Sequence, residues 1–107
     1  MTKAWGKTMD FAAFQAASAE LDNRLLEAGA RLGAVTESLA AEMGIPARGP
    51  MGLTPDRIKF DPRYRIAKAA ADIAFAELRA FNGRYAPRFK KEIRAAIDAR
   101  RRAKCSA

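Results

Sequence analysis

A series of apolar or small residues at alternating spacings of three and four constrains the fold of this chain more than any other feature. Its members, which would share one side of a helix, are Phe11, Phe14, Ser18, Leu21, Leu25, Ala28, Leu32, Val35 and Leu39. Such a heptad pattern is typical of a long helix that buries a narrow seam against a second helix. Asp10 is suited to cap this helix and Gly44 to end it, so we predict a helix over 10–43.

The segment that follows, residues 44–61, is predicted to be a connecting loop. From Gly44 to Gly52 it contains two prolines and three glycines, a composition that interrupts a helix. Thr54 and Pro55 then match the pattern of a helix cap followed by proline at the first helical position. They predict one short helical turn that ends near Phe60.

A second long helix is predicted over 62–82, because Asp61 and Pro62 repeat the same start signal. Small and apolar residues again recur at spacings of three and four, at Ala67, Ala71, Ala74, Leu78, Phe81 and Tyr85. The alanines in this series would allow a close approach to the bulkier first helix.

The Asn82-Gly83 pair and Pro87 predict a break or kink near 82–87, after which a basic helix spans 87–103. No stretch alternates between apolar and polar residues for long enough to predict a strand. The predicted fold is therefore all-α, an antiparallel, coiled-coil-like helical hairpin with a basic C-terminal helix.

The length of 107 residues allows one domain at most. We divide the chain into an N-terminal arm (1–9), a single helical domain (10–104) and a short tail (105–107). A chain this short and this rich in alanine buries little apolar area by itself, which favours burying one face against a second copy. The sequence thus predicts self-association, with a homodimer as the simplest form.

The positive charge of the chain is concentrated at its C-terminal end. The formal net charge is +8, and residues 84–107 contain nine bases and two acids, which is +7. Residues 10–44 contain six acids and two bases, which is −4. A basic end of this kind predicts a polyanionic or acidic partner.

On a helical wheel most bases of the last helix lie opposite its apolar residues. We call the basic face the seven residues Arg84, Arg88, Lys90, Lys91, Arg94, Arg101 and Arg102. Guanidinium and ammonium groups in such a row bind phosphate oxygens. We therefore expect this face to engage the backbone of a nucleic acid or, failing that, an acidic protein surface.

Alternative explanations of the basic face stay open. Positive residues near a helix C-terminus stabilise the helix dipole without any ligand. The acidic first helix would neutralise the basic face if the two lay side by side. An anionic membrane surface is less favoured as a ligand, because the apolar side of the last helix is narrow and lacks tryptophan.

A second candidate site is a set of protein contacts outside the last helix. It consists of Trp5, Arg48, Met51 and Leu53. Long irregular loops often carry function, and tryptophan is enriched at the energetic centres of interfaces. The competing interpretation is that the connector packs on its own apolar residues, and that the tryptophan fastens the N-terminal arm to the helices.

Catalysis is not expected, and neither is a cofactor, a metal site or a small-molecule substrate. The sequence contains no histidine, which is the usual general base and the commonest zinc ligand. Its single cysteine, Cys105, cannot form a thiolate metal site or an internal disulfide. Asp72 and Glu77 are five residues apart and would point in different directions, so they do not form a catalytic pair.

No apolar run reaches the ~20 residues of a membrane-spanning helix, and the first residues lack the apolar core of a signal peptide. We therefore expect a cytoplasmic protein of a bacterium or of a phage-infected cell. The leading expectation for its function is non-catalytic binding of nucleic acid. One alternative is a phage or mobile-element inhibitor or adaptor that binds a host nucleic-acid machine, as anti-CRISPR proteins do. The other is a structural or scaffolding protein that assembles through its heptad surface.

Overall fold

Helices make up all the regular structure in residues 9–106, the part of the chain that the computed structural model describes. Their order is α1 (Phe11–Met43), η1 (Pro50–Gly52), α2 (Asp56–Lys59), α3 (Pro62–Tyr85), η2 (Ala86–Phe89) and α4 (Lys90–Ser106). The predicted all-α class is thus confirmed. None of the helices in this range is apolar over enough residues to cross a membrane.

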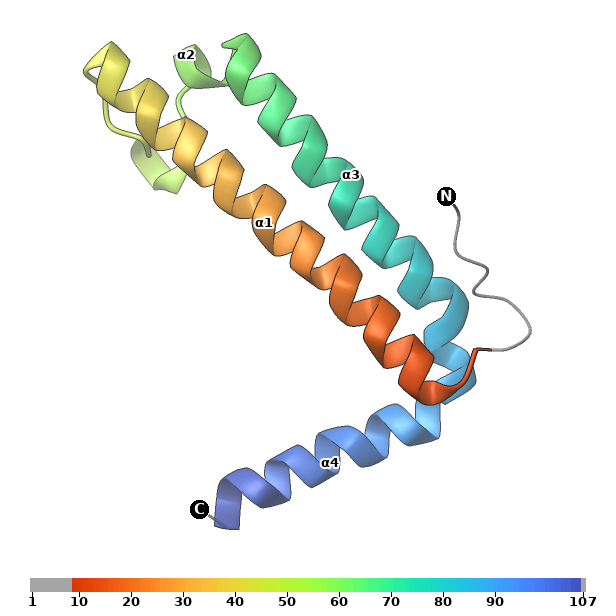
Figure 1. Cartoon of the computed structure of the whole chain (residues 1–107). Helices are drawn as coiled ribbons and strands as arrows, with labels where there is room; N and C mark the ends of the chain where they lie inside the picture. Colours follow the sequence, from red (N-terminus) through yellow and green to blue (C-terminus); the bar gives the residue numbers. More distant parts are fainter. Residues whose placement is uncertain (1–8, 107) are drawn as a thin grey trace.

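The two long helices lie side by side and run in opposite directions, and α4 leaves one end of the pair at an angle (Figure 1). At the start of α1, the carboxylate of Asp10 accepts a hydrogen bond of 2.8 Å from the backbone N–H of Ala13. At its end, Gly44 adopts the left-handed conformation (φ 65°), and its N–H reaches the carbonyls of the last turn. Only glycine reaches this conformation without steric cost. Both ends of α1 are therefore set by local chemistry.

Two clusters of buried side chains hold α1 and α3 together, one at each end of the pair. The aromatic cluster lies at the end from which α4 leaves, and its buried members are Phe14, Ala17, Leu21, Phe81 and Tyr85. The connector cluster lies at the other end, and its buried members are Leu39, Ala40, Ile58 and Tyr64. Between them α3 contributes the buried alanines Ala67 and Ala74, whose small side chains let the helices approach each other closely.

The connector is tied to the helices through α2 and the start of α3. The side chain of Ile58, on the single turn of α2, is completely buried in the connector cluster. Arg63 donates hydrogen bonds to the carboxylates of Asp61 (3.1 Å) and of Glu42 on α1 (2.8 Å). The side-chain hydrogen bond from Arg63, followed by the one from its backbone N–H, lowers the pKa of Asp61. The same contacts, first with Asp61 and then with Glu42, raise the pKa of Arg63.

The C-terminal end of α3 lies beyond the residue at which we predicted it. The helix continues through Asn82 and Gly83 to Tyr85, and η2 separates it from α4, which extends to Ser106 rather than 103. Phe81 and Tyr85 are four residues apart and both enter the aromatic cluster, which requires that the chain between them stay helical. Tertiary packing thus outweighs the local tendency of an asparagine–glycine pair to end a helix.

Replacing Ile58 with alanine should reduce the free energy of unfolding by about 2–5 kcal/mol, because it leaves a cavity under the connector. Urea titration followed by circular dichroism measures this loss. The matched control is Ile66→Ala on α3, where the isoleucine is 73% exposed and the same change should cost no more than about 0.5 kcal/mol. Equal losses in the two variants would show that the connector is not anchored through Ile58.

Candidate nucleic-acid interface

The direction of α4 is set by aromatic packing at its first turn. The ring of Phe89, the last residue of η2, lies 5.1 Å from that of Phe14 and 5.8 Å from that of Phe11, measured between centroids. Ile93, one turn later, also packs against the aromatic cluster. Beyond this point α4 projects away from the α1–α3 pair (Figure 1). One side of its first turns is therefore buried, and the rest of the helix surface faces solvent.

Two guanidinium groups of the basic face are held against one aromatic ring. Arg84 and Arg88 each lie 5.4 Å from the centroid of the Tyr85 ring, which is itself buried in the aromatic cluster. Cation–π contacts of this kind contribute roughly 0.5–1 kcal/mol each at exposed sites. They restrict the two long side chains and keep their charges at the junction of α3 and α4.

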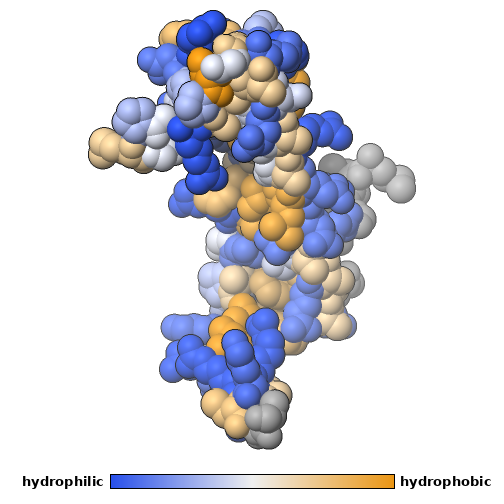
Figure 2. All heavy atoms as spheres, turned by 90° about the vertical axis from the view of Figure 1, so that its left-hand side faces the viewer, coloured by the Kyte–Doolittle hydropathy of each residue, from blue (hydrophilic) through white to orange (hydrophobic). Residues whose placement is uncertain are grey.

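All seven residues of the basic face are exposed, and they occupy one continuous stretch of chain. Arg84 belongs to the last turn of α3, Arg88 to η2, and the other five to α4. In Figure 2, hydrophilic side chains gather around the lower part of the molecule, where α4 lies. The structure thus brings the predicted residues together at one end of the molecule.

Two acidic residues of α1 form ion pairs with bases outside the basic face. Glu20 pairs with Arg24 on α1 itself at 3.0 Å, and Glu42 pairs with Arg63 at 2.8 Å. Among residues 9–106, no carboxylate lies within 4.0 Å of the charged groups of six basic-face residues. These six are Arg84, Arg88, Lys90, Lys91, Arg94 and Arg101. This arrangement does not favour the alternative in which the acidic first helix neutralises the basic face.

The connector residues proposed as protein contacts are also exposed. The side chain of Met51 is 94% exposed and that of Leu53 is 62% exposed, and Arg48 is exposed as well. Met51 adopts the left-handed conformation (φ 63°), which is unfavourable for a residue with a side chain. The competing interpretation, in which the connector packs on itself, holds for Ile45, which contacts the connector cluster. Trp5 lies outside the described residues.

A groove in the angle between α1 and α4 was not among the predicted sites. It has a volume of about 890 Å³ and is lined by residues of α1, α3, η2 and α4. No pattern within one helix could have indicated it, because it exists only through the direction in which α4 leaves α3. Within the described residues there is no group of three or more acidic, cysteine or histidine side chains that could bind a metal ion.

Comparison with protein-family models, with curated proteins and with solved structures finds no match to the chain. The functional argument therefore rests on the geometry and charge of its own residues.

Replacing Lys90, Lys91 and Arg94 together with alanine should leave the free energy of unfolding nearly unchanged. Each is exposed and has no carboxylate partner in the described structure, and exposed substitutions of this kind cost no more than about 0.5 kcal/mol each. Alanine also favours the helix, and removing three positive charges relieves repulsion at low salt. Urea titration at low and high salt measures both effects. A large loss of stability at either salt would show that these bases are required by the fold.

Proposed function

We propose that the protein is a non-catalytic nucleic-acid-binding protein whose basic face contacts the phosphate backbone. The observation that carries this proposal is the set of six exposed basic residues without a carboxylate within 4.0 Å in residues 9–106. A folded protein gains little from keeping so many like charges close together. Their repulsion is relieved when phosphates release their counterions and take up the positive charges.

The dimensions of α4 suit contact with several phosphates at once. Its 17 residues span about 25 Å, over which a duplex presents many backbone charges. Arginine and lysine contacts to phosphate fix the position of a protein on the duplex but carry no base sequence information. The rings nearest to the basic face, Tyr85 and Phe89, are engaged in the aromatic cluster, so they are not free to stack on unpaired bases. We therefore favour a duplex bound with little sequence preference.

The remainder of the molecule acts as a support in this proposal. The α1–α3 pair would form a coiled-coil-like hairpin, and η2 would form the kink that turns α4 away from it. This geometry keeps the acidic surface of α1 apart from the phosphates that α4 contacts. A cytoplasmic location, where nucleic acid is accessible, is part of the same proposal.

Binding to a labelled DNA duplex should weaken steeply as salt is raised from about 50 to about 200 mM, with a log–log slope near −5 if six bases contact phosphates. Replacing Arg84, Arg88, Lys91 and Arg94 with alanine should reduce that slope by about 0.9 for each lost contact. The same variant should abolish the mobility shift at moderate salt. Fluorescence anisotropy and gel mobility shift measure these effects.

The matched control removes four exposed bases from the other end of the molecule. These are Arg48, Arg57, Lys59 and Arg65. This variant has the same net charge as the first and should keep most of the affinity. Equal losses in the two variants would show that net charge alone attracts the duplex, and no binding at low salt would refute the proposed function.

A second candidate function is that of a protein-binding adaptor or inhibitor that uses the connector. Met51 favours it, because an apolar side chain that is 94% exposed and held in an unfavourable backbone conformation is a feature of contact loops. In this case Met51→Ala with Leu53→Ala should abolish stoichiometric co-purification of a host protein. Phe60→Ala, which removes another exposed apolar side chain of the connector, is the control. Co-purification that survives the double substitution would exclude the connector as the contact.

A further inference from the structure

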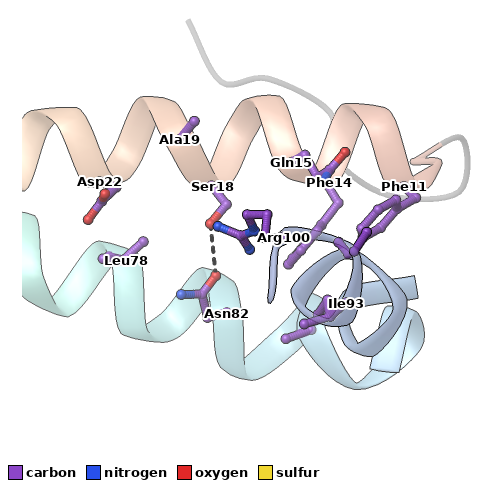
Figure 3. Close-up of a pocket in the computed structure, with 13 residues that line it drawn as sticks. Phe11, Phe14, Gln15, Ser18, Ala19, Asp22, Leu78, Asn82, Ile93 and Arg100 are labelled. Atoms are coloured by element: carbon purple, nitrogen blue, oxygen red, sulfur yellow. Dashed lines mark hydrogen bonds between the residues drawn. The ribbon is translucent and has the colours of Figure 1, made fainter. Parts of the chain in front are cut away.

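The groove between α1 and α4 is lined mainly by small and apolar side chains, with five polar ones among them. The small or apolar residues that line it include Phe14, Ala19, Ile93, Ala96 and Ala99. Figure 3 shows the hydrogen bond of 3.4 Å that Ser18 donates to the side chain of Asn82 across the base of the groove. The alanines leave space for another helix to approach closely.

One acidic and one basic side chain line this groove without forming an ion pair with each other. Asp22 comes from the α1 wall and Arg100 from the α4 wall, and both are exposed. Neither forms a hydrogen bond or an ion pair with another described residue. The groove therefore offers a partner one site for a positive group and one for a negative group.

The chain as a monomer exposes far more surface than a compact protein of its mass. Its accessible surface is 8255 Å², compared with about 5,900 Å² expected for a folded monomer of 11.7 kDa. An allowance of about 1,300 Å² for residues 1–8, as if fully extended, still leaves an excess of about 1,000 Å². The radius of gyration is 18.6 Å, compared with about 13 Å expected for a compact domain of 107 residues.

We propose that a second copy of this chain occupies the groove. In a symmetric dimer, α4 of each copy enters the angle between α1 and α4 of the other. Asp22 of each copy then pairs with Arg100 of its partner, so that one ion pair forms twice about the two-fold axis.

Self-complementarity favours a second copy over other occupants. In a two-fold dimer both copies use the same surface, so that surface must contain both partners of each ion pair. This groove does so, because it has an acid on one wall and a base on the other. A stable interface buries about 800 Å² on each partner, which the excess surface of this chain can supply. A nucleic acid fits poorly, because it would meet the carboxylate of Asp22 and leave the apolar lining exposed to water.

The surface needed for such a dimer extends beyond the groove along both helices. On α1, Leu26 is 64% exposed and lies one turn after Asp22, on the same side of the helix. On α4, Ile93, Ala96 and Arg100 share one side, whereas Lys91 and Arg94 project from the other side. The dimer would therefore leave those two bases exposed, and it does not depend on the proposed function.

Complementary charge reversals test this pairing directly. Asp22→Arg and Arg100→Asp should each abolish the dimer at micromolar concentration, because two pairs of like charges would then meet. A mixture of the two variants restores both attractive pairs and should form a one-to-one heterodimer. Sedimentation equilibrium without nucleic acid measures the masses, and the unaltered protein should give twice 11.7 kDa. An ion pair within one copy would not be restored by mixing.

A second pair of variants tests the groove without reversing a charge pair. Ala99→Glu places a larger side chain in the groove and should weaken the dimer at least ten-fold. Ala80→Glu makes the same change at an exposed residue of α3 that does not line the groove, and should have no such effect. A monomeric unaltered protein, equal effects of the two glutamates, or a mixture that stays monomeric would each overturn the proposal.

Discussion

The packing of Phe89 on Phe14 and Phe11 is the contact on which the rest of the structure depends. It joins the start of α4 to the N-terminal part of α1, with ring centroids 5.1 and 5.8 Å apart. Phe14 in turn stacks on Phe81 of α3 at 5.5 Å, so a single aromatic cluster connects all three long helices. Because α4 has few other attachments, its direction, the groove beside it and the exposure of the basic face all follow from this cluster.

The distribution of charge in the molecule is a consequence of this geometry. If α4 had folded back along α1, its bases would lie next to the acids of that helix, and the charges would largely cancel. Instead the carboxylates of Glu20 and Glu42 pair with Arg24 and Arg63, which are close to them on the α1–α3 pair. Exposed pairs of this kind add little to stability, and neither of them involves a base of α4. Helix α1 carries a net negative charge and α4 a net positive charge, so these two helices differ in charge as well as in direction.

The sequence was sufficient for the fold class but not for the arrangement of the last helix. Spacings of three and four residues predict α1 and α3 well, because a helix of that length must bury a continuous stripe. The end of α3 was placed too early, since the Asn82-Gly83 signal is local whereas Phe81 and Tyr85 are held by residues far away in the sequence. The groove, with Asp22 and Arg100 on its two walls, depends on the angle set by η2, and no periodicity encodes that angle. The exposure of Met51 likewise depends on how η1 turns.

Charge and folding are coupled within α4 itself. Helices in proteins gain most of their stability from tertiary packing, and α4, with 17 residues, is packed against the aromatic cluster only through its first turns. Bases four residues apart, such as Lys90 and Arg94, repel each other along its surface and oppose helix formation. A polyanion bound to the basic face removes that repulsion, and a second copy in the groove buries the opposite side of the same helix. A ligand that binds only the helical form of α4 stabilises that helix. The two proposed interactions share α4, so each would strengthen the other.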